Sequence, residues 1–313
     1  MTGGRARTVF IGSGDFGRES LRRLAEHDDI DLLGVITAPS RPAGRHGRVR
    51  PTPISTLASA LSVHALLIPT RLRDPDAIAD VLALDPDLIV LADYGQIVPP
   101  ALLEVRRGAL NLHPSLLPRH RGATPIPAAI LAGDLQTGVT LMRMDEGIDT
   151  GPIVAQAAVP LDGDETTPDL EAMLEVTAGD LLEEHVGPWL RGDAAARPQP
   201  DDGTTMTWPL RREDGRLDPA RSAKELERQI RAYQPWPGTF VDAPPGRLIL
   251  WSASPEVDRS APPPGAFDET GLGVGRGERL RIGEVQPAGG RRMTWDAFVR
   301  GRPSIIGASI DGS

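Results

Sequence analysis

Short apolar runs alternate with helix-like segments through the first half of the chain, and this alternation limits the choice of fold more than any other feature. Thr8–Ile11, Asp31–Thr37 and Asp87–Leu91 are apolar runs of strand length, and the segments Arg18–Glu26 and Pro75–Ala83 have helical spacing. The run Asp87–Leu91 is almost continuously apolar, which is typical of a parallel strand that is buried on both faces. The pattern predicts an α/β fold, with a Rossmann-like, mostly parallel sheet that carries helices on both faces.

Further segments of both kinds complete this first domain, which we assign to residues 1–191. We expect additional strands at His64–Pro69, Ala109–His113, Val139–Met144 and Ile153–Val159, and additional helices at Ile54–Leu61, Ala128–Ala132 and about Pro168–Val186.

The composition changes after this domain. Residues 192–207 are polar, rich in Pro and Gly and without periodicity, which predicts an interdomain linker. Residues 208–313 are predicted to form a smaller domain, whose first helix begins at an S-x-x-E capping box of Ser222 and Glu225. Its strand-like runs, separated by Gly and Pro turns, indicate a small β-barrel; they lie at Arg247–Ala253 and Leu280–Glu284.

The composition also excludes several kinds of site. The 313 residues include no cysteine, which rules out disulfides, thiolate nucleophiles and cysteine-bound zinc, and we expect no metal site. No apolar stretch approaches the ~20 residues that a membrane-spanning helix needs. The amino-terminal residues have no apolar signal-peptide core. We therefore expect a cytoplasmic protein.

The distribution of charge is more informative than its sum. A formal net charge of −9 at first argues against a nucleic-acid partner. However, residues 41–50 contain four arginines and no acid, and residues 271–302 contain seven arginines and three acidic residues. Such runs are most often solvated surface, and the alternative is that they contact a nucleic acid.

A glycine motif raises one rival interpretation. Residues 12–17 match G-x-G-x-x-G after a strand and before a helix, which is typical of dinucleotide-binding oxidoreductases. Such a site also needs an acidic residue at the end of the second strand to bind the ribose, but that strand ends here in Ile36, Thr37 and Ala38. We therefore interpret the glycines as a tight strand-to-helix turn.

Asn111 and His113 are the first candidate catalytic residues. They are two positions apart on a predicted strand, so their side chains project to the same side, and Pro114 ends the strand. Ligands of open α/β sheets bind at the carboxyl ends of the strands. An amide beside an imidazole suits acyl transfer, because the amide can stabilise an oxyanion while the imidazole moves a proton. The alternative for an isolated N-x-H is a buried histidine next to a turn asparagine.

Two carboxylates follow in a glycine-containing loop. Asp145 and Asp149 come after a predicted strand, and such residues are usually turn formers. A carboxylate brought against His113 would orient the imidazole, as the third member of a triad does. Sequence spacing alone does not place Asp149 there.

Several motifs carry a resemblance to a known family. They are residues 111–126 (NLHPSLLPRHRGATPI), 132–140 (AGDLQTGVT) and 144–151 (MDEGIDTG). With these motifs the chain resembles the folate-dependent formyltransferases, and among them the methionyl-tRNA formyltransferases, over nearly its whole length. Residues 41–45 resemble the insertion loop of that family, 94–97 the end of its folate-pocket strand, and 230–237 the start of its C-terminal domain.

The resemblance implies transfer of a formyl group from 10-formyltetrahydrofolate to the α-amine of methionyl initiator tRNA, in translation initiation. Carried over residue by residue, it implies that Asn111, His113 and Asp149 are catalytic and that Arg41 and Arg45 contact the tRNA. It implies a folate site lined by Tyr94, Gly95, Gln96, Ile97, Ser115, Leu116, Leu117, Pro118, Asp145 and Gly147. We expect a monomer with an OB-like tRNA-binding domain at residues 208–313.

The chain departs from the family pattern at three positions. Gly14 replaces a proline in the first turn, Asp93 replaces a small residue, and His120 replaces an aromatic residue, which we interpret as a stacking or surface residue. Other functions also remain open. The nearest is formyl transfer to an amino-sugar or nucleotide-sugar amine, and a non-catalytic RNA-binding protein and a dehydrogenase are weaker alternatives.

Overall fold

The computed structural model describes residues 4–43, 48–244, 246–258 and 260–310. The chain divides into two compact units. Unit 1 comprises Met1–Pro125, Gln136–Pro160 and Glu171–Trp208, and unit 2 comprises Ile126–Leu135, Leu161–Leu170 and Pro209–Ser313.

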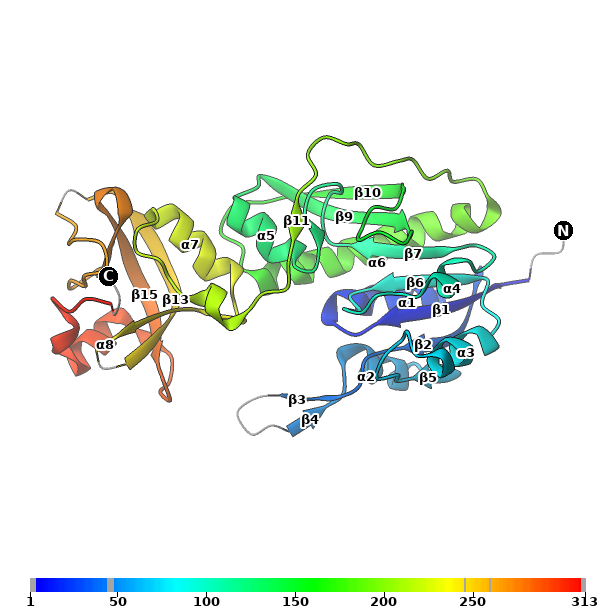
Figure 1. Cartoon of the computed structure of the whole chain (residues 1–313), viewed down its shortest axis with the longest axis horizontal. Coiled ribbons are helices and arrows are strands. Elements are labelled where there is room, and N and C mark those ends of the chain that lie inside the picture. Colours follow the sequence, from blue (N-terminus) through cyan, green and yellow to red (C-terminus); the bar gives the residue numbers. More distant parts are fainter. Residues whose placement is uncertain (1–3, 44–47, 245, 259, 311–313) are drawn as a thin grey trace. The chain divides into compact units, whose positions relative to one another are not determined.

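Unit 1 is built on a seven-stranded sheet with the strand order β10-β9-β7-β6-β1-β2-β5 (Figure 1). The strands are β1 (Ala6–Gly12), β2 (Ile30–Ile36), β5 (Ala65–Leu67), β6 (Leu88–Ala92), β7 (Ala109–His113), β9 (Gln136–Arg143) and β10 (Ile153–Pro160). The strands from β7 to β5 pair in parallel, whereas β9 and β10 pair antiparallel. The order reverses direction at β1, where a crevice forms at the carboxyl ends of the strands.

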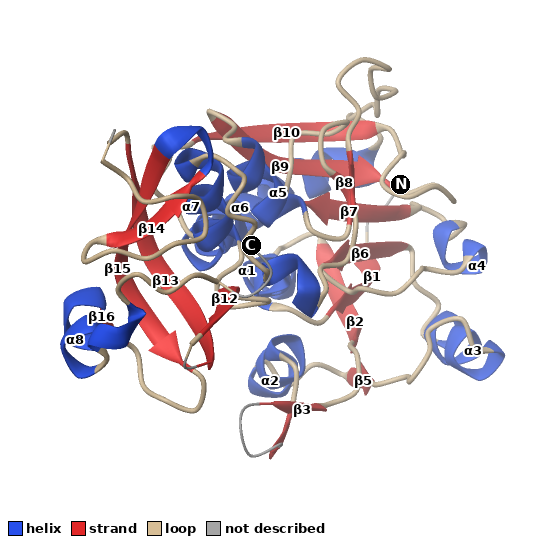
Figure 2. Ribbon diagram, turned by 60° about the vertical axis from the view of Figure 1, so that its left-hand side comes forward, coloured by secondary structure: helices blue, strands red, loops and turns tan. Residues whose placement is uncertain are grey.

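Helices cover both faces of this sheet (Figure 2). They are α1 (Arg18–Glu26), α2 (Pro53–Ala60), α3 (Pro75–Ala83), α4 (Pro100–Leu103) and most of α6 (Thr167–Arg191). On one face, Val81 of α3 and Leu102 of α4 belong to the same buried cluster as Val9 of β1. On the other face, Gly17 lies against Phe10 immediately before α1 begins, and ion pairs join α1 to α6.

Two pairs of very short strands complete unit 1. The hairpin of β3 (Arg41–Ala43) and β4 (Arg48–Arg50) is antiparallel, and β8 (Arg121–Gly122) pairs in parallel with β11 (Met206–Thr207). The second pair lies partly in the segment predicted as a linker. Residues 192–207 are therefore part of unit 1. Hydrogen bonds join them to β8 and, at the bridge between Ile153 and Arg197, to β10.

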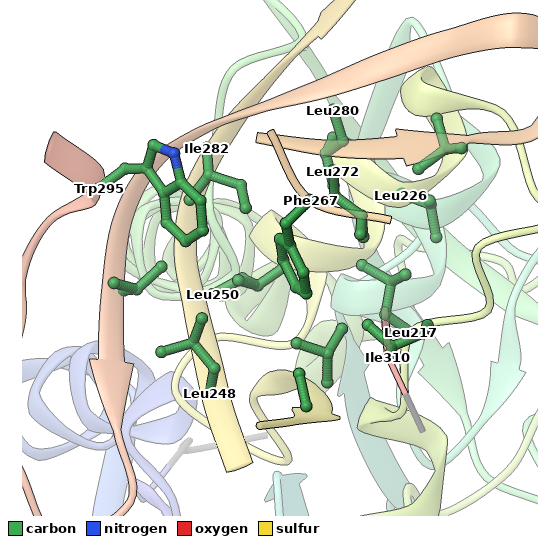
Figure 3. Close-up of a cluster of buried hydrophobic side chains, with 14 of the residues drawn as sticks. Leu217, Leu226, Leu248, Leu250, Phe267, Leu272, Leu280, Ile282, Trp295 and Ile310 are labelled. Atoms are coloured by element: carbon green, nitrogen blue, oxygen red, sulfur yellow. The ribbon is translucent and has the colours of Figure 1, made fainter. Parts of the chain in front are cut away.

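Unit 2 contains an antiparallel sheet and three helices, two of which pack against the sheet. Its strands are β12 (Thr239–Ala243), β13 (Gly246–Glu256), β14 (Gly271–Val274), β15 (Glu278–Pro287) and β16 (Met293–Thr294), and its helices are α5 (Pro125–Ala132), α7 (Ala223–Ala232) and α8 (Trp295–Gly301). The sheet order is β12-β13-β15-β14, with β16 against β15. Figure 3 shows its buried core, in which aliphatic side chains of β13 and β15 surround Phe267 and Trp295.

The predicted capping box is present at the start of α7. The Ser222 hydroxyl accepts from the Glu225 amide, and the Glu225 carboxylate accepts from the Ser222 amide at 3.0 Å. The predicted fold class is confirmed: a Rossmann-like, mostly parallel α/β sheet is accompanied by a smaller β domain. Within the described ranges, no helix has the length and apolar character needed to cross a membrane.

Candidate active site

The centre of the candidate site is the end of β7. Asn111 and His113 project from the same side of this strand, and both side chains are buried. In the sheet, Asn111 pairs with Leu91 of β6 on one side and with Met142 of β9 on the other. Two neighbouring strands therefore fix the backbone that carries both side chains.

Asp149 reaches these side chains because the loop after β9 folds back over β7. One carboxylate oxygen, Oδ1, accepts from Asn111 Nδ2 at 3.5 Å, and the other, Oδ2, lies 3.6 Å from His113 Nδ1. Oδ2 also accepts from the Gly122 amide at 2.8 Å. Asp149 itself has φ 52°, a left-handed conformation that aspartate tolerates better than most residues. The structure thus brings the three predicted catalytic side chains together.

The other ring nitrogen of His113 is also occupied. Nε2 lies 2.9 Å from the carbonyl oxygen of His120, so it carries the proton when it donates to this acceptor. His120 is buried, and its amide donates to the Thr205 hydroxyl at 2.8 Å. His120 is therefore not a surface residue, and its backbone positions the imidazole of His113; a stacking role for its side chain stays a prediction. The nitrogen that remains for exchange with Asp149 or with reacting atoms is Nδ1.

Gln199 is a site residue that the sequence did not suggest. Its amide nitrogen donates to the Asp149 carbonyl at 2.8 Å and to the Gly151 carbonyl at 2.7 Å. Its amide oxygen accepts from Arg121 Nε at 3.0 Å and from a second guanidinium nitrogen at 2.6 Å. Gln199 therefore joins the loop that carries Asp149 to the loop that follows His113. Only a pairing across about fifty residues reveals this role.

A cavity of about 920 Å³ lies at the same edge of the sheet. Its lining comes from the turn after β1, the segment around the start of α2 and the loop after β6, and includes Tyr94, Gly95 and Gln96 of the predicted folate site. The Tyr94 ring is buried, its hydroxyl has no hydrogen-bond partner in the described part of the chain, and burial raises its pKa to about 12. Ile97, by contrast, is 83% exposed.

The remaining predicted folate residues lie apart from this cavity. Ser115, Leu117 and Pro118 are buried against β9, where the Leu117 amide donates to the Thr140 hydroxyl at 3.0 Å, and Leu116 is half-buried beside them. Asp145 is exposed and accepts from the Gly147 amide at 3.0 Å, so it shapes the loop that carries Asp149. Their role in folate binding stays a prediction.

The predicted tRNA contacts are only partly described. Arg41 begins β3, and Arg45 lies outside the described residues. In unit 2, Arg279 is buried and forms ion pairs with Asp258, Asp268 and Glu256, so it stabilises the fold and is not part of a basic surface. The exposed arginines of this region are Arg276, Arg281, Arg291, Arg292, Arg300 and Arg302. No group of His, Asp and Glu suited to a metal ion occurs among the residues with described positions.

The glycine motif after β1 forms a strand-to-helix turn. Thr37, at the end of β2 where a ribose-binding acid would stand, is buried, and its hydroxyl lies 2.7 Å from the Thr52 hydroxyl. The Ser13 hydroxyl accepts from the Ala38 amide at 3.0 Å. The crevice at this turn is thus held by hydroxyl groups, and the second strand provides no carboxylate for a dinucleotide ribose.

Comparison with known protein families identifies the class of enzyme. The family model for formyl transferase matches residues 6–186, and that for the formyl transferase C-terminal domain matches residues 209–303. The chain therefore belongs to the formyl transferase family, and the predicted enzyme class is confirmed.

Individual similar proteins give more detail than the family models do. The chain is similar to the methionyl-tRNA formyltransferase of Symbiobacterium thermophilum, with 42% identity over 96% of this chain and 94% of the relative. It is 41% identical to the methionyl-tRNA formyltransferase of Halorhodospira halophila, over 97% of this chain and 99% of the relative. Its fold is similar to that of WlaRD, a sugar 3N-formyl transferase solved in the presence of dTDP and 5-N-formyl-THF. That match has a TM-score of 0.65 and 17% identity and covers 90% of this chain and 98% of WlaRD.

Proposed function

We propose that the chain transfers the formyl group of 10-formyltetrahydrofolate to the α-amine of methionyl initiator tRNA, for translation initiation. The observation that carries this proposal is the Asp149 carboxylate, 3.5 Å from the Asn111 amide nitrogen and 3.6 Å from His113 Nδ1. Relatives named methionyl-tRNA formyltransferase match the chain through both of its family regions, which supports the tRNA acceptor.

The proposed reaction is a direct transfer without a covalent enzyme intermediate. The neutral α-amine attacks the formyl carbon on N10 of the folate, a new C–N bond forms, and the carbonyl oxygen becomes an oxyanion. Asn111 donates to this oxyanion, and one such donor is typically worth ~10²–10³ in rate. The C–N10 bond then breaks as N10 receives a proton, leaving a formylated amine and tetrahydrofolate.

His113 is the group that moves the proton from the attacking nitrogen to N10, directly or through a water. Proton transfer by a positioned side chain typically contributes ~10²–10⁴ in rate. Since Nε2 bonds to the His120 carbonyl, Nδ1 performs the exchange, and Asp149 orients the ring for it. This arrangement assigns each member of the trio one task.

The binding assignments extend the proposal to the rest of the chain. We place the folate against the loops that contain Tyr94–Ile97, Ser115–Pro118 and Asp145 with Gly147, and the acceptor stem against Arg41 and Arg45. Residues 1–191 form the catalytic domain, 192–207 the connection and 208–313 an OB-like tRNA-binding domain. The protein acts in the cytoplasm as a monomer.

One assay tests the acceptor. The protein is incubated with 10-formyltetrahydrofolate and, in parallel, with methionyl initiator tRNA or with an amino-sugar nucleotide, and the formylated amine is identified by mass spectrometry. We expect formyl-methionyl-tRNA and no formylated sugar. Formylation of the sugar alone would overturn the tRNA assignment, and formylation of neither would overturn the proposed reaction.

A further inference from the structure

Two of the three departures from the family pattern are in direct contact. A Cβ placed on Gly14 would lie 1.6 Å from Asp93 Oδ2 and 2.6 Å from Asp93 Cγ. The backbone of Gly14, with φ −85° and ψ −177°, is one that any residue adopts, so the turn itself does not require glycine. A larger residue would instead meet the Asp93 carboxylate, which occupies the space above Gly14 and would have to move. The two residues therefore form a matched pair.

Asp93 is fixed in this position by its backbone. Its φ is 52°, and its carbonyl accepts from the Ser13 amide at 2.8 Å and from the Gly14 amide at 3.3 Å. Asn and Asp are the residues, apart from glycine, that tolerate this left-handed conformation best. The carboxylate is thus aimed over the turn after β1 and into the lining of the 920 Å³ cavity.

Asp93 also lies beside the catalytic strand. In the parallel pairing of β6 with β7, Ala92 is opposite Leu112, so Asp93, the first residue after β6, follows at the level of His113, the last residue of β7. Neighbouring strands are about 4.8 Å apart in the hydrogen-bonding direction. Asp93 and His113 therefore stand at the ends of neighbouring strands, at the same edge of the sheet.

The described groups whose charge acts on the Asp93 carboxyl are acidic. Water reaches Asp93 through the cavity, but closely packed protein atoms desolvate the carboxyl and raise its pKa, and the negative charge of Asp15 raises it further. Glu171 of α6 is a further acidic neighbour, and Arg18 lies 3.6 Å from Asp15. A cationic group placed in this cavity would relieve the repulsion among these carboxyls.

We propose that the Asp93 carboxylate accepts N–H hydrogen bonds from the α-amine of the acceptor and holds this amine next to His113, which makes Asp93 a determinant of acceptor affinity. This inference rests on the proposed function. A carboxylate accepts N–H bonds from the ammonium form that arrives and also from the neutral amine that attacks. Outside the Tyr94–Gln96 segment assigned to the folate, the cavity lining fits an aminoacyl nucleotide, because Leu57, Ala60 and Pro53 are apolar while Arg18 and Arg50 provide positive charge.

The test is Asp93→Asn in the full-length chain, because asparagine keeps both the shape and the left-handed conformation while removing the charge. We expect the KM for methionyl-tRNA to rise about 10-fold or more, as for loss of a hydrogen bond to a charged group. The KM for 10-formyltetrahydrofolate should stay the same. The matched control is Asp85→Asn, which changes the same residue type at a similar φ of 51° but at an exposed loop outside the cavity.

Initiator tRNA without its methionyl group sharpens the test, because it lacks the amine but keeps all the contacts of the nucleic acid itself. Its inhibition constant should be the same for Asp93→Asn and for the wild type. An unchanged KM for methionyl-tRNA, a raised KM for the folate instead, or equal weakening of charged and uncharged tRNA would each overturn the inference. If the wild type itself does not formylate methionyl-tRNA, the proposed function fails, and this result is separate from the behaviour of Asp93.

Discussion

At the scale of single residues, His113 is notable because both of its ring nitrogens face oxygen atoms. The His120 carbonyl lies 2.9 Å from Nε2, and the Asp149 carboxylate lies 3.6 Å from Nδ1. The first distance is that of a hydrogen bond, and the second is longer than one. The imidazole is therefore anchored on one side and able to exchange a proton on the other.

Removing the imidazole of His113 or the carboxylate of Asp149 should lower turnover more than it weakens folate binding. We expect His113→Ala and Asp149→Ala each to lower kcat by ~10²–10⁴, because proton transfer in the transition state is lost. Folate affinity should change little. Single-turnover kinetics and folate titration measure the two effects, with the exposed His64→Ala as a control. Near-normal turnover of either variant would contradict its assigned role.

The raised pKa of Glu171 predicts how the stability of the protein depends on pH. Burial raises its pKa to about 7, and the charges of Asp93, Asp15 and Glu175 contribute in the same direction. The folded state then binds more protons than the unfolded state between about pH 4.5 and 7, so its stability falls as the pH rises through this window.

Glu171→Gln should therefore stabilise the protein at pH 8 but not at pH 4.5. Because the side chain is only half-buried, we expect a gain of about 1–2 kcal/mol at pH 8, less than the full pKa shift would give. Urea unfolding at the two pH values measures it. Glu184→Gln, an exposed position on the same helix, is the control, and an equal effect of Glu171→Gln at both pH values would refute the pKa assignment.

At the scale of elements, the segments with a clear local pattern were predicted well and the two-residue strands were not. Helices α1 and α3 and strand β7 have the predicted bounds, because apolar spacing and proline at a first turn mark them locally. The strands β8 and β11 have only two residues each, and their pairing joins positions more than eighty residues apart. No local pattern encodes such a pairing.

In the candidate site, too, residues with a local sequence signal were predicted, whereas residues placed by contacts between distant segments were not. Asn111 and His113 could be inferred from their spacing on one strand and, with Asp149, from the family motif. Gln199 and the carbonyl of His120 could not, because their roles depend on hydrogen bonds between distant loops. The Gly14–Asp93 contact was likewise visible only as two separate departures from the family pattern.

Gln199→Ala tests whether the segment after α6 positions the catalytic loop. It removes hydrogen bonds to Asp149, Gly151 and Arg121, each typically worth about 0.5–1.5 kcal/mol, so we expect kcat to fall about 10-fold. Melting temperature should also fall by a few degrees because these hydrogen bonds contribute to stability, so kcat is measured well below it. Asp202→Ala, exposed on the same segment, is the control. Unchanged kcat would show that Gln199 serves only the fold.

At the scale of the whole molecule, a net charge of −9 has to be reconciled with the polyanionic acceptor that we propose. The buried ion pairs of Arg279 show that a count of arginines overstates the basic surface of unit 2. What remains are exposed arginines such as Arg281 and Arg300. Attraction to tRNA then depends on local charge within an acidic protein.

Acceptor affinity should therefore fall steeply as salt is added, since each phosphate that is neutralised releases counterions. Arg281→Gln combined with Arg300→Gln should weaken tRNA binding and reduce the slope of log affinity against log salt by roughly 1–2. Filter binding between 50 and 200 mM salt (about the range over which such effects are large) measures this slope. Arg71→Gln, an exposed arginine of unit 1, is the control, and a salt-independent affinity would favour a small-molecule acceptor.

The pairing of β8 with β11 has a consequence for the order in which the protein is made. All seven strands of the main sheet precede residue 161, whereas the segment that ties down the loop after His113 ends at Thr207. A nascent chain that has emerged only as far as Arg191 contains the whole sheet and all three proposed catalytic residues. It still lacks the segment that pairs with β8 and holds the loops around these residues. Competence for the reaction is thus acquired late in biosynthesis, after the scaffold that bears it.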